Sequence, residues 1–152
     1  MDNCFAACGS CGCVDNEGIT KGDLDRFTDK IENVLNDEKG RRLFRNFMIT
    51  SKMKDGRRTL SFWEDVERLL IGKDSSETMS PRNYLRAVDR LIDDAERIEE
   101  LDFAAMERLT IARDSENKEE INEVLKILKV EATKALRREY GAFRRHFVLQ
   151  QK

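Results

Sequence analysis

Two apolar stripes meet head to tail around residues 31–63, and this stretch constrains the fold more than any other. The first stripe consists of Leu43, Phe44, Phe47 and Met48. The second consists of Phe62, Trp63, Val66, Leu69 and Leu70. In each stripe the spacing places the side chains on one face of a helix. Aromatic side chains at this density need burial against neighbouring helices, so we expect the stretch to form the centre of a core.

The rest of the chain from Thr20 onward has the same helical period. One stripe runs from Thr20 to Leu35, others begin near Ser80 and Leu101, and a long one, broken once, ends near Phe147. Polar stretches separate the expected helices: Asn36-Asp37, Lys52–Arg58, Gly72–Met79 and Arg113–Asn117. The pattern predicts an all-α fold, a single bundle of about eight or nine helices over residues 20–149.

Polar residues in front of these stripes have the chemistry of helix caps. Thr20 with Asp23 resembles a capping box with a short acid. Ser80 precedes Pro81, which suits a first helical turn because that position needs no amide donor. Further candidate caps are Asp37, Thr59, Ser61 and Asn117. These residues predict where the helices begin.

The charge pattern limits the classes of function. The chain has 152 residues with 28 basic and 30 acidic side chains, intermixed, and a net charge of −2. We therefore expect no nucleic-acid partner, because such a protein needs a basic excess. Arg137-Arg138 and Arg144-Arg145 form local basic pairs, either on a solvated helix face or toward acidic lipid headgroups. No apolar run approaches the roughly 20 residues that cross a bilayer, and no signal peptide is recognisable.

The stretch 31–63 also resembles the regulator of G-protein signalling (RGS) domain. That pattern contains an apolar turn, a glycine, spaced Phe residues and then Asn-Leu-Glu-Phe-Trp. Ile31–Met48, with Gly40, matches the first part, and Leu60-Ser61-Phe62-Trp63 matches the second. The resemblance extends over about residues 24–147 and is weak around 103–135. The matching residues are mainly those that build the fold.

The resemblance implies a helical bundle that binds the GTP-loaded α subunit of a heterotrimeric G protein. Such domains accelerate hydrolysis from outside the active site, because the α subunit carries its own arginine. They hold its switch loops in the transition-state arrangement. We therefore expect no catalytic residue, no cofactor and no metal in this chain, and a monomer that acts on its partner's active site. No catalytic cluster can be assembled around the single histidine, His146.

Three segments match the family's contact surface for the α subunit. The first contains Arg58, Thr59 and Leu60, where the family usually has Glu-Asn before an apolar residue. The second contains Glu100, Leu101 and Asp102, where the family usually has Asn-Leu-Asp. The third contains Arg138, Glu139 and Ala142, where the family often has Asp, Ser and Arg. Leu60 and Leu101 match apolar positions of the pattern, and Asp102 is the polar contact position that is retained. The other positions differ in charge or in hydrogen-bonding groups.

All four cysteines, Cys4, Cys8, Cys11 and Cys13, lie in a small-residue tail over residues 1–19 that we expect to be flexible. The tail resembles the N-terminal cysteine clusters of several RGS proteins, which favours S-palmitoylation and a place at the cytoplasmic face of a membrane. A four-thiolate metal site is one alternative, although Cys11-x-Cys13 is tight for zinc. An unmodified tail is the other.

Two functions from different classes follow. The first is a lipid-tethered regulator that binds a GTP-loaded α subunit with reduced or altered GTPase activation. The second is a scaffold that uses the same bundle to bind other proteins without G-protein contact.

Overall fold

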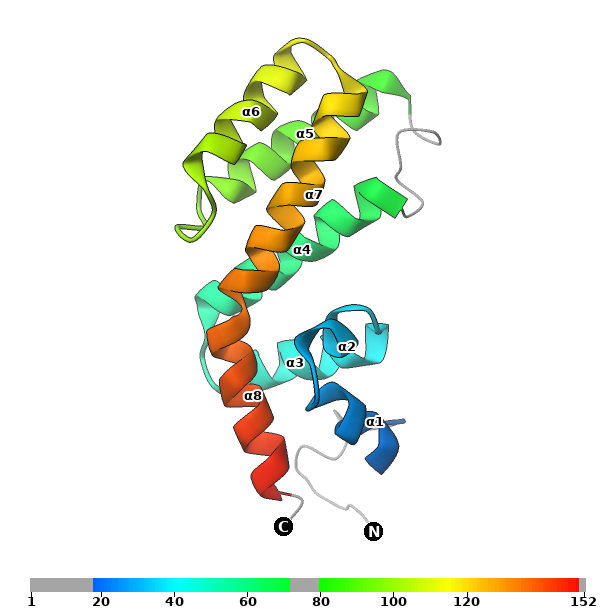
Figure 1. The fold of residues 1–152 in the computed structure, drawn as a ribbon, viewed down its shortest axis with the longest axis vertical. Helices are drawn as coiled ribbons and strands as arrows, with labels where there is room; N and C mark the ends of the chain where they lie inside the picture. Colours follow the sequence, from blue (N-terminus) through cyan, green and yellow to red (C-terminus); the bar gives the residue numbers. More distant parts are fainter. Residues whose placement is uncertain (1–17, 72–79, 151–152) are drawn as a thin grey trace. The chain divides into compact units, whose positions relative to one another are not determined.

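The computed structural model describes residues 18–71 and 80–150, and all regular elements in these ranges are α-helices. The prediction of an all-α fold is therefore confirmed. The described residues divide into two compact units (Figure 1). One unit contains residues 18–54 and 138–150, and the other contains residues 55–71 and 80–137. The cysteine tail and the expected loop Gly72–Met79 lie outside the described residues.

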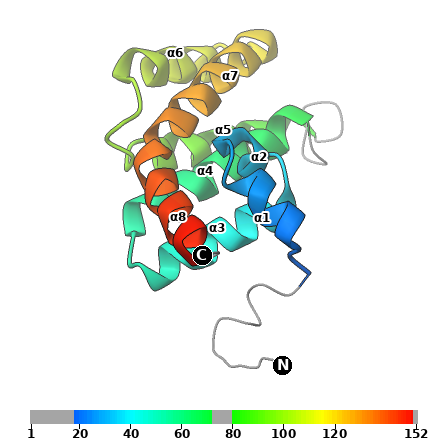
Figure 2. The ribbon, with the colours of Figure 1, turned by 60° about the horizontal axis from the view of Figure 1, so that its bottom comes forward.

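The first unit consists of three consecutive helices and the last helix of the chain. These are α1 (Lys21–Phe27), α2 (Ile31–Leu35), α3 (Glu38–Thr50) and α8 (Arg137–Gln150). Figure 2 shows α8 beside α3, and ring contacts join the two helices. The Phe44 and Phe143 rings meet edge to face at 5.2 Å, and the Phe47 and Phe143 rings do so at 5.8 Å. Phe27, Phe44 and Phe143 are fully buried, so aromatic packing forms the core of this unit.

A partly buried hydrogen bond also joins α8 to α1. The Tyr140 hydroxyl donates to the Phe27 carbonyl oxygen at 2.8 Å. Burial raises the pKa of the Tyr140 phenol to about 12, because ionisation would place a charge in a poorly solvated position. The hydrogen bond satisfies one of the last carbonyl groups of α1, which has no partner within the helix.

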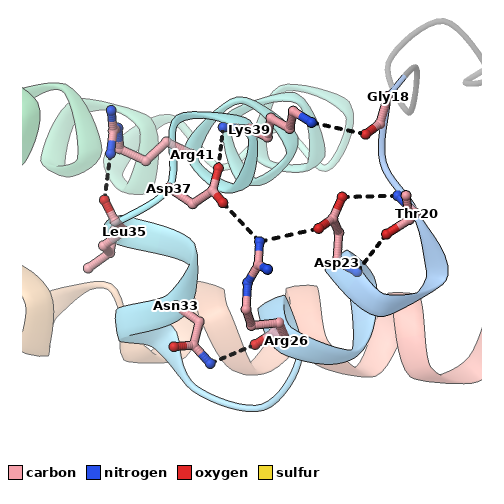
Figure 3. Close-up of polar contacts among 9 residues, drawn as sticks. All are labelled: Gly18, Thr20, Asp23, Arg26, Asn33, Leu35, Asp37, Lys39 and Arg41. Carbon is pink, nitrogen blue, oxygen red and sulfur yellow. Dashed lines mark hydrogen bonds and ion pairs between the residues drawn. The ribbon is translucent and has the colours of Figure 1, made fainter.

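Side-chain caps define the start of the first helices (Figure 3). The Asp23 amide donates to Thr20 Oγ1 at 3.0 Å, and the Thr20 amide donates to Asp23 Oδ2 at 3.1 Å, which completes the predicted capping box. Asp37 caps α3 by accepting from the Lys39 amide at 2.8 Å. Arg26 bridges both capping carboxylates, at 3.3 Å from Asp23 and 2.9 Å from Asp37.

The expectation of one helix from Thr20 to Leu35 was wrong, because the chain breaks between α1 and α2. The Thr28 hydroxyl donates to the Leu24 carbonyl at 2.8 Å. The Asn33 side-chain amide donates to the Arg26 carbonyl at 2.9 Å (Figure 3). The Asn33 side chain therefore satisfies a carbonyl at the end of α1 that a further helical turn would otherwise use.

The second unit contains the remaining four helices. These are α4 (Lys54–Ile71), α5 (Pro81–Ala95), α6 (Phe103–Asp114) and α7 (Lys118–Ala135). Figures 1 and 2 both show α6 alongside α7, and α6 also packs against α5. The predicted caps are confirmed at Ser80, which accepts from the Asn83 amide, and at Asn117, which accepts from the Glu120 amide.

Buried aromatic groups with satisfied polar ends connect the helices of this unit. Trp63 is 2% exposed, and its indole N–H donates to Thr133 Oγ1 at 3.2 Å. Tyr84 is fully buried, and its hydroxyl donates to Asn122 Oδ1 at 3.0 Å. These bonds join α4 and α5 to α7. Burying the polar ends without partners would destabilise the fold.

The expected polar loop Lys52–Arg58 was wrong. Helix α3 ends in a Schellman turn, in which the Met53 amide donates to the Met48 carbonyl at 2.8 Å and Lys52 has a φ of 59°. Helix α4 then starts at Lys54, so Thr59 and Ser61 lie inside it and cap nothing. A glycine commonly marks such a turn, and its absence here hid the helix end.

The aromatic stretch that predicted a core contributes to both units. Phe44 is fully buried in the first unit and Trp63 is buried in the second. Phe47 is half-buried in the first unit, with its ring 5.3 Å from that of His146.

No helix in the described part of the chain has the length and apolar character to span a membrane. The described ranges also contain no group of three or more metal-ligating side chains.

Gly40 permits a close approach of α3 to α2 and to Phe27 in the first unit. A Cβ at this position would lie 2.7 Å from the Val34 carbonyl oxygen and 3.1 Å from Cε1 of Phe27. The backbone oxygen and the buried ring cannot move aside as the end of a flexible side chain could. The glycine of the RGS-like pattern therefore has a packing role here.

We predict that Gly40→Ala lowers the free energy of unfolding by about 1–3 kcal/mol, because overpacking outweighs alanine's higher helix propensity. Gly141→Ala is the matched control, since its Cβ would meet only the end of the Arg145 side chain at 3.5 Å. That change should be neutral or stabilising by up to about 1 kcal/mol. Urea unfolding measures both. Equal effects of the two substitutions would contradict the packing role of Gly40.

Candidate functional site

Two of the three predicted contact segments border one small cavity in the second unit. The cavity has a volume of about 130 Å³. Its lining comes from the start of α4 and from the turn after α5: Asp55, Arg58, Thr59, Arg97, Ile98, Glu99 and Glu100. Segments some forty residues apart in the sequence therefore meet at one surface.

The α4 side presents alternating buried and exposed residues. Thr59 and Leu60 are buried, and the Thr59 hydroxyl donates to the Asp55 carbonyl at 2.9 Å within the helix. Arg58 and Asp55 lie one turn apart and pair at 3.6 Å between Nη1 and Oδ1. Both side chains are well exposed, so this ion pair contributes little to stability and its members remain accessible to a partner.

Two buried apolar side chains hold the turn after α5. Ile98 and Leu101 are 4% and 6% exposed, whereas Arg97, Glu99 and Glu100 are exposed. The Leu101 amide donates to the Ile98 carbonyl at 3.3 Å, which closes the turn. The anchored backbone thus fixes the direction of the charged side chains between and beside the anchors. Such preorganisation lowers the entropy lost on binding.

Asp102 has a role inside the fold. Its Oδ1 accepts from the Ala104 amide at 3.3 Å and so caps α6. The residue itself is exposed. The position that best matches the family's contact pattern therefore also sets the start of a helix. Leu101, by contrast, presents no accessible side chain.

The third predicted segment lies on α8, in the first unit. Arg138 is exposed and its Nη2 donates to Glu139 Oε2 at 3.1 Å. Glu139 is only 4% exposed, and Ala142 is half-buried. Of the nine residues carried over from the resemblance, four have buried side chains: Thr59, Leu60, Leu101 and Glu139. The accessible groups are mainly charged ends.

The structure adds cavity residues that the sequence comparison did not assign. Arg97 and Ile98 precede the matched Glu-Leu-Asp segment by two to three positions, and Glu99 adjoins it. The apolar pair Ile98 and Leu101, three residues apart, was a signal for an anchored turn. The cavity rim thus carries two cations, Arg58 and Arg97, among three carboxylates. This mixed rim suits charged hydrogen bonds with a protein surface.

Comparison with known proteins gives a family for most of the chain. The family model for the regulator of G protein signaling domain matches residues 30–140, which includes the whole of the second unit and part of the first. No curated protein and no solved structure matches the chain. The matched range includes the aromatic stretch, the cavity, the first two contact segments and, of the third, Arg138 and Glu139 but not Ala142. The chain therefore belongs to the family of regulators of G-protein signalling.

Proposed function

We propose that this protein binds the GTP-loaded α subunit of a heterotrimeric G protein through the cavity rim of the second unit. The observation that carries the proposal is the convergence of the α4 start and the anchored turn 97–102 at one surface. In the family, the segments at these positions contact the α subunit's switch loops. The rim presents exposed charged side chains on a fixed backbone. This arrangement favours binding of a mobile loop, because the rim itself loses little entropy and its charges can pair with those of the loop.

The chemistry in this proposal belongs to the partner. An RGS domain adds no arginine to the active site, because the α subunit has its own. It stabilises the loop arrangement in which donors already point at the developing charge. This chain would therefore act as a regulator of another protein's hydrolysis and not as an enzyme.

Glu100 sets the expected strength of activation. The family usually has an asparagine here, whose side chain both donates and accepts hydrogen bonds. An ionised glutamate only accepts, and its charge repels the phosphates and the transition state. We therefore propose that the protein binds the α subunit but accelerates hydrolysis weakly.

The direct experiment compares binding and catalysis for the same partners. The full chain is tested against a panel of α subunits, by binding to the form with GDP and aluminium fluoride and by single-turnover GTP hydrolysis. We expect preference for the transition-state mimic over the GDP form, with a small acceleration. Failure to bind any α subunit in the mimic form would remove the proposal.

We predict that Glu100→Asn increases the acceleration of hydrolysis, because it restores a donor and removes a negative charge. Glu99→Asn is the matched control, since it removes the same charge from the same cavity one residue earlier. Single-turnover hydrolysis with saturating protein separates the rate from the affinity. Equal rates for Glu100→Asn and the parent, with binding intact, would show that the resemblance misplaces this turn.

A scaffold function is the second candidate. Two features favour it: four of the nine residues matched to the family's contact surface are buried, and Glu100 replaces the usual asparagine. Both reduce the groups available to bind an α subunit. This function predicts partners that bind regardless of the nucleotide state. Recovery of such partners in an affinity experiment, together with no binding to the transition-state mimic, would select it.

We also propose that Cys4, Cys8, Cys11 and Cys13 carry acyl groups that hold the protein at the inner face of a membrane. Clustered cysteines beside Phe5 and small residues support this modification. A single acyl chain gives marginal attachment, so two or more are needed. Labelling of cells with a palmitate analogue should give a thioester signal that hydroxylamine removes and that Cys→Ser at all four positions abolishes. Stoichiometric zinc bound by these thiols would contradict it.

A further inference from the structure

Helix α6 has apolar residues on two faces. Ala105, Leu109 and Ala112 are buried against the neighbouring helices. On the outward side Phe103 is 74% exposed and Ile111 is 61% exposed. A helix that is apolar all round is normally buried on every side, and large exposed apolar groups mark interaction surfaces.

The outward face of α6 borders an apolar groove shared with α5, its neighbour in Figure 1. The groove has a volume of about 260 Å³. Its lining residues are Ile92, Ala95, Glu96, Phe103, Met106, Glu107, Leu109, Thr110 and Ile111. Small-molecule pockets usually enclose about 300–1,000 Å³. The groove therefore suits a few side chains of a protein segment better than an enclosed ligand.

All charged groups in the groove lining are acidic. Glu96 directly follows α5 and Glu107 lies on α6, and no basic residue lines the groove. The nearby cations on α6 have partners elsewhere. Arg108 pairs with Glu120 of α7 at 2.8 Å, and Arg113 pairs with Asp89 of α5 at 2.6 Å.

The same elements carry more negative charge around the groove. Outside the groove lining, Asp93 directly follows Ile92 on α5 and is exposed, and Asp114 is exposed at the end of α6. Glu99 and Glu100 follow in the turn that leads to α6. An apolar floor with an acidic rim is complementary to an apolar face flanked by lysine or arginine.

We infer that this groove binds an amphipathic helix of another protein, with apolar residues at i, i+3 or i+4, and i+7 and with basic residues beside them. Helices of this kind fill hydrophobic grooves by their apolar face. The Phe103 ring and the Ile111 side chain would supply the contact area, and the Glu96 and Glu107 carboxylates would orient the helix. This binding does not depend on the proposed α-subunit site.

Charge disfavours the other occupants. A second copy related by a twofold axis would place the same acidic rim against itself. Residues 1–17 of this chain contain Asp2, Asp15 and Glu17 and no lysine or arginine. An anionic lipid surface would repel the rim. A basic helix is the occupant whose charge fits.

The test uses a fluorescein-labelled synthetic helix with leucines on one face and lysines on the others, and a second peptide with glutamates in place of the lysines. Fluorescence anisotropy with the full chain should show saturable binding of the lysine peptide alone. Phe103→Ser with Ile111→Ser should weaken it at least about tenfold, which corresponds to about 1.4 kcal/mol, because the two changes remove the largest exposed apolar side chains of the groove. Ile71→Ser, at a residue of α4 that is also 74% exposed, should leave it unchanged.

Charge reversal tests the rim separately from the floor. Glu96→Lys with Glu107→Lys should transfer the preference to the glutamate peptide, whereas Glu119→Lys with Glu123→Lys on α7 should not. No binding of the lysine peptide, equal binding of both peptides, or no effect of the Phe103 and Ile111 changes would overturn the inference. Concentration-dependent dimerisation that those changes abolish would assign the groove to a second copy, and would overturn it too.

Discussion

Burial of the apolar stripe on α4 is the constraint on which the second unit and its candidate surface depend. Trp63 is held inside by packing and by its hydrogen bond to Thr133, and Lys129 lies over its ring at 5.3 Å while pairing with Glu67. A helix with one face fixed in this way has its other face fixed as well, because the helical period is 3.6 residues. All three of Asp55, Arg58 and Thr59 line the cavity, but only Asp55 and Arg58 have exposed side chains, whereas Thr59 is buried.

The turn after α5 depends on the same kind of anchoring. Ile98 and Leu101 are buried and hold the backbone of the turn in place. The charged side chains of Arg97, Glu99 and Glu100 therefore extend from a fixed backbone. Asp102 continues the turn directly into α6 by capping it. A residue that the family pattern marks for partner contact thus has a local structural reason to be there as well. Retention of Asp102 alone is for this reason weak support for partner binding.

Sequence reasoning succeeded where a side chain itself carries the signal. Thr20, Asp37, Ser80 and Asn117 were recognisable as caps because their oxygens bind the free amides of the first turn. Prediction of the helix boundaries failed where they are set by backbone conformation or by bonds between residues distant in the sequence. Lys52 adopts a left-handed conformation without being a glycine, so a helix end and a helix start were read together as one polar loop. The break after Phe27 was missed because the Asn33 bond that stabilises it joins residues seven positions apart.

The candidate site likewise contains residues that the sequence predicts and residues that only the packing of the helices brings there. The resemblance located Arg58 and Glu100, and periodicity could have shown that Thr59 and Leu60 face the core. Arg97 was not predicted, because its place at the cavity follows from how the turn meets α4. The apolar groove was missed because the stripe of α6 reads equally well as an inner face, and only packing shows which side is covered.

The proposed α-subunit surface is tested most directly by amide hydrogen exchange of the full chain, alone and with an α subunit in its aluminium fluoride form. Binding at the cavity rim predicts slower exchange in residues 97–102 and in the first turns of α4, with the outward face of α6 unchanged. Unchanged exchange in both of these segments, in a complex that demonstrably forms, would contradict it.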